Sequence, residues 1–143
     1  MIGLTAACAV GIRAHGGEMY PEECCGALLG SQESSGARVT RIERTVNSRG
    51  EERGHRFRIA PEEYGRVERL AEALGLALLG FYHSHPDHPA VPSGYDREHA
   101  LPFFHYLVLA VISGRPGELT SWVLSEDRGV FEHEKLVFEA PEE

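Results

Sequence analysis

Residues 76–85, LALLGFYHSH, are the part of the sequence that most constrains the fold. They form a continuous apolar run between Gly75 and a Pro-rich loop, which is typical of a strand covered on both faces. A strand that is buried on both sides needs a layer above and a layer below it. We therefore expect a sheet flanked by helices, of the α/β or α+β class.

The covering helices are predicted from apolar spacing. Residues 61–75 open with Pro61, repeat apolar residues three to four apart and close at Gly75, so they predict a helix. Ala60 offers no capping side chain at its start. A second helix is predicted over residues 5–15, stopping at Gly16 and Gly17, with an apolar face made of Ala6, Val10, Ile12 and Ala14.

The remaining strands are predicted from short apolar or alternating runs between turn signals. We expect them at 24–30, 38–46, 103–113, 118–125 and 129–138, with a turn at GRPG, residues 114–117, and a short helix from Ser93. The segment 47–58 is charged and punctuated by glycine, so we expect a mobile surface loop suited to substrate contacts.

Composition excludes several classes of protein. The 143 residues, 42% hydrophobic and 25% charged, suit one globular domain over residues 1–143. The net charge of -8 opposes binding to nucleic acid or to anionic membranes. No apolar run approaches the roughly 20 residues of a membrane span, and no signal-peptide pattern is visible, so we expect a cytoplasmic protein. The sequence leaves open whether it forms a homodimer.

The cysteines predict no disulfide framework. Cys8, Cys24 and Cys25 are odd in number and show no CxxC spacing, so we expect reduced, buried thiols. Thiolate is nonetheless a better zinc ligand than carboxylate, and Cys24 and Cys25 keep that alternative open.

Chemistry concentrates in HSHPDHPAVPSGYD, residues 83–96. On a strand, His83 and His85 point to the same face, and a folded-back loop brings Asp96 to the strand end. Two imidazoles and a carboxylate leave the fourth position of a tetrahedral zinc open to water, as in catalytic zinc sites. Zinc lowers the pKa of such a water from about 15.7 to ~7.

The spacing of His83, His85, Ser93 and Asp96, with EECCGALLG upstream, resembles the JAMM (MPN+) metalloprotease family. The resemblance implies a single-domain MPN fold, a mixed sheet flanked by helices and related to cytidine deaminases. It also implies that the two histidines and Asp96 bind Zn²⁺. Glu23, three residues before a strand-opening glycine, would be the general base, and Ser93 would hold the oxyanion.

Within that family the chain looks most like small prokaryotic members that act on ubiquitin-like sulfur-carrier proteins. The activity implied is zinc-dependent hydrolysis of the amide bond after a C-terminal Gly-Gly of such a carrier. The identity of the carrier and its leaving group, a cysteine, a lysine side chain or another amine, stay open.

Other interpretations of the same residues remain. Two histidines and a carboxylate also form the facial triad of non-haem Fe(II) enzymes, although that chemistry leaves Glu23 and Ser93 without a role. Ser93 and Asp96 alone form a capping box. The same fold also serves as a non-catalytic scaffold. Among nearby residues, His88 is expected at the surface or behind the ligands, and Trp122 in core or edge packing.

Overall fold

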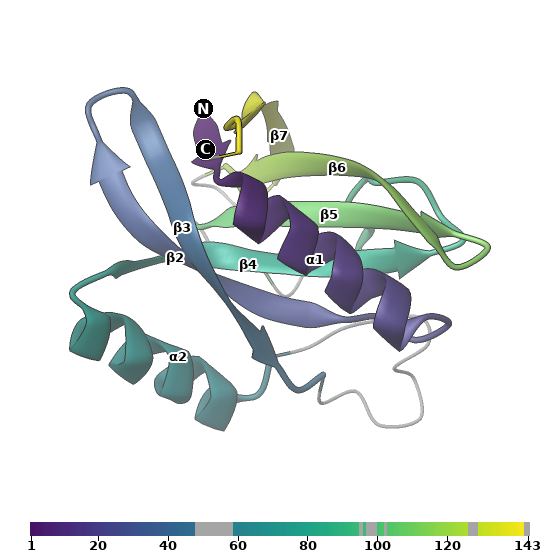
Figure 1. Cartoon of the computed structure of the whole chain (residues 1–143), viewed down its shortest axis with the longest axis horizontal. Coiled ribbons are helices and arrows are strands. Elements are labelled where there is room, and N and C mark those ends of the chain that lie inside the picture. The colour runs from purple at the N-terminus through teal and green to yellow at the C-terminus, as the bar shows by residue number, and fades with distance from the viewer. Residues whose placement is uncertain (48–58, 95, 97–99, 102, 126–128, 142–143) are drawn as a thin grey trace.

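A computed structural model of the chain describes residues 1–47, 59–94, 96, 100–101, 103–125 and 129–141 (Figure 1). The predicted surface loop at 47–58 lies outside the described residues, apart from Asn47. The elements are β1 (Ile2–Leu4), α1 (Ala6–Met19), β2 (Cys25–Glu33), β3 (Gly36–Thr45), α2 (Pro61–Leu74), β4 (Ala77–Pro86), β5 (His105–Ile112), β6 (Arg115–Leu124), β7 (Phe131–Glu134) and β8 (Leu136–Phe138).

The strands form one mixed, eight-stranded sheet in the order β7-β6-β5-β4-β2-β3-β1-β8. Strand β4 lies inside the sheet, antiparallel to β2 and parallel to β5. Its residues from Leu79 to Pro86 are buried without alternation, as predicted for a strand covered on both faces. The expected mixed sheet flanked by helices is confirmed.

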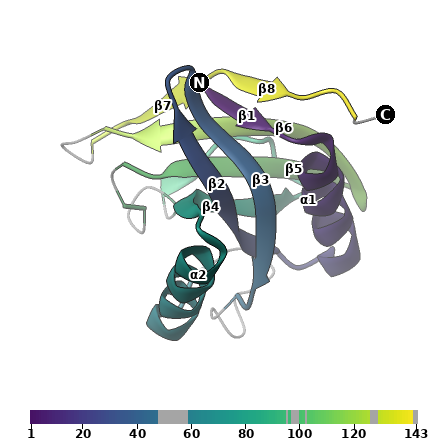
Figure 2. The same cartoon turned by 60° about the vertical axis from the view of Figure 1, so that its left-hand side comes forward.

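The two helices cover opposite faces of this sheet (Figures 1 and 2). Buried side chains of α1 pack with Tyr82 of β4 and with alternate residues of β5. Val67 and Ala71 of α2 pack instead with Phe81 of β4, on the other face. Because side chains alternate along a strand, odd-numbered positions of β4 from Phe81 onward lie on the α2 face.

The sheet curves until its two edges meet. Strands β7 and β8 lie at opposite edges, yet only Lys135 separates them in sequence. Neighbouring Cα atoms are about 3.8 Å apart, so the edges must be adjacent at this corner. The Ile2 N–H donates to the Lys135 carbonyl there, at 3.0 Å. The prediction of one strand over 129–138 was therefore wrong, and the three-residue β1 was too short to be recognised.

The first helix departs from its prediction in length and orientation. It continues past Gly16 and Gly17 to Met19. Gly16 is a site of close helix–sheet approach, since a Cβ there would lie 2.5 Å from Leu109 Cδ2. Of the predicted apolar face only Ile12 is buried, whereas Val10 is 68% exposed. The other buried residues of the helix are small or polar: Cys8, Ala9, His15 and Gly16.

The second helix follows its prediction closely. Pro61 is its first residue, and Ala60 provides no side-chain cap. Gly75 ends the helix in the left-handed conformation, with φ of 68°, which glycine adopts without strain. The predicted turn at 114–117 begins earlier, since Ser113 and Gly114 have positive φ and Arg115 already belongs to β6.

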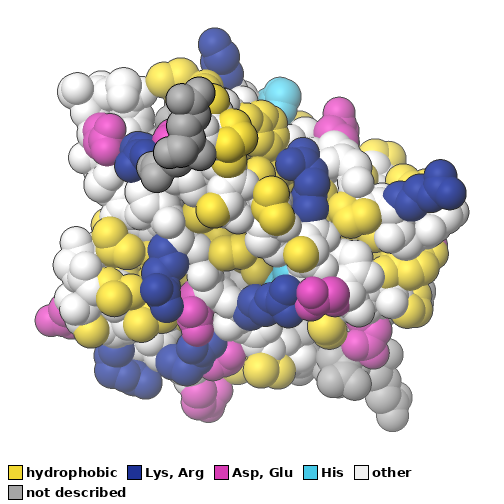
Figure 3. Space-filling model, viewed as in Figure 1, with side chains coloured by type: hydrophobic (Ala, Val, Ile, Leu, Met, Phe, Trp, Pro, Cys, Tyr) yellow, Lys and Arg dark blue, Asp and Glu magenta, His cyan; other side chains and the backbone are white. Residues whose placement is uncertain are grey.

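Cys8, Cys24 and Cys25 are free and buried, as predicted. On the face seen in Figure 3, hydrophobic side chains are interspersed with charged ones of both signs. Within the described part of the chain, neither helix has the length and apolar character needed to cross a membrane.

A buried histidine predicts how stability depends on pH. His15 is 4% exposed, and its Nδ1 lies 2.7 Å from the Tyr82 hydroxyl. Burial, with the charge of Arg44, lowers the pKa of His15 to about 4. An unfolded histidine titrates near 6.5, so between about pH 6.5 and 4 the unfolded chain binds a proton that the folded chain does not. The free energy of unfolding should therefore fall as the pH drops through this window.

We expect His15→Gln to flatten that dependence even though the variant is less stable overall. The measurement is urea unfolding from pH 4 to 7 in the presence of a metal chelator, which keeps metal binding out of the comparison. A variant with the same slope as the wild-type protein would contradict this account of His15.

Candidate metal centre

The two histidines of the candidate site come from the end of β4. His83 and His85 lie on the face that α2 covers further back, while Ser84 between them faces α1. Strand pairing holds this segment on both sides, because His83 is opposite Cys25 in β2 and beside Val108 in β5. Both imidazoles are therefore carried by an interior strand of the sheet and not by a free loop.

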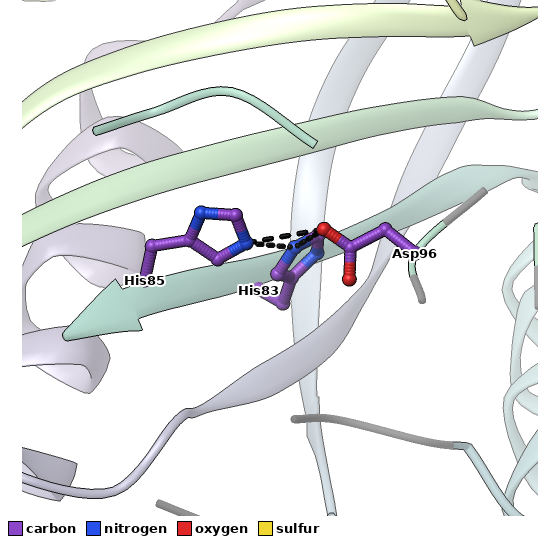
Figure 4. Close-up of side chains that lie close together, drawn as sticks. All are labelled: His83, His85 and Asp96. Carbon is purple, nitrogen blue, oxygen red and sulfur yellow. Dashed lines mark hydrogen bonds and ion pairs between the residues drawn. The ribbon is translucent and has the colours of Figure 1, made fainter. Parts of the chain in front are cut away.

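Asp96 joins the two histidines from a turn of helical residues that includes Gly94. Its Oδ2 lies 3.1 Å from Nε2 of His83 and 3.1 Å from Nε2 of His85. The two Nε2 atoms are themselves 3.1 Å apart. All three residues are buried, and their ligand atoms point to one spot (Figure 4).

This triangle fits a small divalent ion. Ligand bonds of about 2.0–2.2 Å place tetrahedral ligand atoms roughly 3.3–3.6 Å apart, close to the observed triangle. His85 Nδ1 lies 3.0 Å from the Pro89 carbonyl, which can only accept, so Nδ1 donates and the neutral ring keeps its lone pair on Nε2 for a metal. Within the described ranges, no fourth histidine, cysteine, aspartate or glutamate joins this group. Three protein ligands are typical of a catalytic metal site.

The electrostatics favour the deprotonated forms of His83 and Asp96, which a metal needs, but they favour the protonated form of His85. Burial lowers the pKa of His83. Burial raises the pKa of Asp96, but the two imidazoles and the Ser93 N–H outweigh it and hold that pKa well below its usual range. For His85, burial lowers the pKa, yet Asp96 and the Pro89 carbonyl reverse the shift and raise it.

Glu23 lies in the wall of the same pocket. The pocket has a volume of about 320 Å³ and is lined by Glu23, His85, His88, Pro89, Val91 and Ser93. Glu23 is only 3% exposed. The segment that carries it is attached to β4, because the Cys24 N–H donates to Ser84 Oγ at 2.8 Å and the Ser84 N–H donates to the Cys24 carbonyl at 3.1 Å.

Gly26, the glycine of the motif, has a packing reason. It lies opposite Tyr82 in the strand pairing, and a Cβ there would fall 2.3 Å from the Tyr82 ring. Because Gly26 has no side chain, the Tyr82 ring can lie against the backbone of β2 at this position. Gly26 therefore leaves room for Tyr82 where β2 pairs with β4, three residues after Glu23.

Ser93 is placed both as a cap and as part of the pocket wall. Its N–H donates to Asp96 Oδ2 at 2.8 Å, and its Oγ accepts the Asp96 N–H at 3.1 Å, so the capping box is present. Because a hydroxyl has one hydrogen of its own, this contact leaves Ser93 able to donate another bond. The exposed Ser93 also lines the pocket that contains Glu23 and His85.

Two contacts at the site were missed from the sequence. Ser84 and the Pro89 carbonyl position Glu23 and His85 respectively. The alternation of HSH alone indicates that Ser84 faces away from the histidines, but not what it meets there. As expected, His88 lies at the surface. Cys24 and Cys25 are buried outside the ligand group.

Fold and site together define a mixed-sheet protein with a buried histidine–histidine–aspartate centre beside a buried glutamate. Residues 5–125 match the family of prokaryotic homologues of the JAB domain, and the chain belongs to this family. The resemblance to JAMM/MPN proteins is thus confirmed.

Individual relatives support this assignment. A desampylase of Haloferax volcanii is 37% identical over 89 residues, 62% of this chain and 62% of that protein. A desampylase of Pyrococcus furiosus is 34% identical over 110 residues, 77% of this chain and 72% of that protein. A JAB1/MPN domain protein of Archaeoglobus fulgidus shares the fold, with a TM-score of 0.62 and 15% identity over 98% of each chain.

The geometry predicts that the protein binds one zinc ion and is stabilised by it. A ligand that binds only the folded state adds about 2.7 kcal/mol at a free concentration 100 times its Kd. We expect Asp96→Ala to abolish both the bound zinc and the thermal shift, while Glu118→Ala, at an exposed carboxylate of β6, retains them. Elemental analysis and thermal unfolding with added zinc measure this. Zinc binding by the Asp96 variant at wild-type strength would contradict the proposed ligand set.

Proposed function

We propose that this protein is a zinc-dependent isopeptidase or peptidase that hydrolyses the amide bond after the C-terminal Gly-Gly of a ubiquitin-like or sulfur-carrier protein. The observation that carries the proposal is one pocket in which His85, Glu23 and Ser93 converge, with His83 and Asp96 beside it. Two relatives bear the name desampylase, an enzyme name that denotes removal of a group, which supports a catalytic role over a scaffold.

The chain's residues divide the chemistry as follows. His83, His85 and Asp96 would hold the metal. When bound, zinc supplies a Lewis acid that polarises a carbonyl and makes water a strong nucleophile near neutral pH. Glu23 accepts the proton of the attacking water and returns it to the leaving amine. Ser93 donates its hydroxyl hydrogen to the oxyanion that develops on the scissile carbonyl.

The burial of this machinery supports a hydrolytic role for Glu23. Glu23 is 3% exposed and lines the same pocket as His85, so its carboxylate is enclosed beside the proposed metal position. General-base catalysis requires such proximity, because the proton acceptor must lie within hydrogen-bond reach of the water. The iron interpretation of the same ligands gives Glu23 no such role.

The direct test offers the zinc-loaded protein two model conjugates of a Gly-Gly carrier, one joined to a lysine side chain and one to a cysteine amine. Mass spectrometry identifies the bond that is cleaved, with and without a chelator. Release of an intact Gly-Gly terminus that stops with the chelator supports the proposal. Bound iron with oxygen-dependent turnover, or no cleavage of either conjugate, would contradict it.

Glu23→Gln should keep zinc and lose nearly all turnover. The amide has nearly the same shape as the carboxylate but cannot accept the proton from water. Zinc content and kcat are measured on the same preparation. Wild-type turnover in a zinc-loaded variant would refute the assignment of Glu23 as the base.

Ser93→Ala should lower kcat by roughly 10²–10³ if the hydroxyl helps to bind the oxyanion. Ser93→Thr, which keeps a hydroxyl, is the matched control and should retain much more activity. If kcat changes twofold or less while zinc affinity or stability falls, Ser93 is only the cap of the turn that carries Asp96.

A further inference from the structure

The loop after β4 presents a backbone carbonyl to His85. Pro89 O lies 3.0 Å from His85 Nδ1 and also accepts the Val91 N–H at 2.9 Å. The second bond closes a three-residue turn around Ala90. Since the Nδ1 hydrogen points to this carbonyl, the position of the turn sets the direction of the His85 ring and of its Nε2 lone pair.

This turn is held from β6 by Thr120. Its Oγ1 donates to the Ala90 carbonyl at 2.6 Å and accepts the Trp122 indole N–H at 2.8 Å. The directions are unambiguous, because an indole N–H can only donate and a carbonyl can only accept. We call this chain from Trp122 through Thr120 to Ala90 the Thr120 brace.

Packing makes the brace stiff. Ala90 is fully buried and clusters with Val108 and Ala110 of β5, and the half-buried Trp122 packs against the same cluster. In the strand register, Thr120 lies opposite Val108, and Val108 lies beside His83. The brace therefore stands on the strand next to the histidine pair, and it grips the turn through both a hydrogen bond and apolar contacts.

We propose that Thr120 is a positioning residue for the metal centre: through Ala90 and the Pro89 carbonyl it fixes the orientation of His85. Thr120 itself touches neither the ligand atoms nor the pocket. The proposal rests on the metal site of the proposed function. It extends that site to β6, beyond the motif formed by residues 83–96.

The test is the zinc affinity of Thr120→Val, measured on metal-free protein by competition with a chromophoric chelator. Valine has the shape of threonine but lacks the hydroxyl, so both bonds of the brace are lost. Outer partners of metal ligands are typically worth 10–100-fold in metal affinity, and we expect the Kd for zinc to weaken by about tenfold or more. Thr120→Ser, which keeps the hydroxyl, should restore most of the affinity.

Zinc affinity separates positioning from general stabilisation. A purely structural residue lowers the unfolding temperature but leaves the Kd unchanged as long as the metal-free protein is folded, which circular dichroism checks. Thr40→Val, at an exposed threonine of β3, is the matched control and should bind zinc like the wild-type protein.

Three results would overturn the proposal. One is a folded Thr120→Val variant with wild-type zinc affinity. Another is an equal loss of zinc affinity in Thr120→Val and Thr120→Ser. If Thr120→Val does not fold, Ala90→Gly loosens the same turn without touching Thr120, and unchanged affinity in that variant is the third. Failure of the wild-type protein itself to bind zinc would refute the metal centre. If the wild-type protein binds zinc and the Thr120 variants bind it equally well, only the Thr120 brace is refuted.

Discussion

The period-two alternation of β4 is the constraint on which the site depends. It directs His83 and His85 to one face and Ser84 to the other, where Ser84 attaches the segment carrying Glu23. The strand cannot slip by one residue without exchanging these two faces. Pairing with β2 and β5 on either side fixes that register, so the placement of both ligands and of the candidate base is a consequence of sheet formation.

The site lies where the layer over this face of β4 changes from helix α2 to the loop that follows β4. Phe81 packs against α2, and two and four residues further along the same face His83 and His85 meet Asp96 and the loop after β4. A buried carboxylate with two imidazoles at 3.1 Å is expensive unless a cation compensates for the lost hydration. The apolar layers on both faces of β4 supply the stability that lets such a group persist inside the fold.

The sequence predicts what is local and fails where tertiary contacts decide. Helix α2, strand β4 and the common face of His83 and His85 follow from spacing, whereas Asp96 was assigned to the same site by the resemblance to a known family. Gly16 did not end α1, because close packing against Leu109 favours a glycine inside that helix. The split at Lys135 depends on the curvature of the whole sheet. Thr120 carries no sequence signal, since its importance comes from a carbonyl thirty residues away.

The groups that orient the metal ligands are also set by tertiary contacts. Residue types determine which atoms can bind a metal, but the direction of each lone pair is set by a second group: the Pro89 carbonyl for His85 and the Ser93 N–H for Asp96. Both of these groups lie in the loop between β4 and the turn of Asp96, and β6 holds that loop through Ala90. The ligand motif is thus contiguous in sequence, whereas the precision of its geometry depends on a strand outside it.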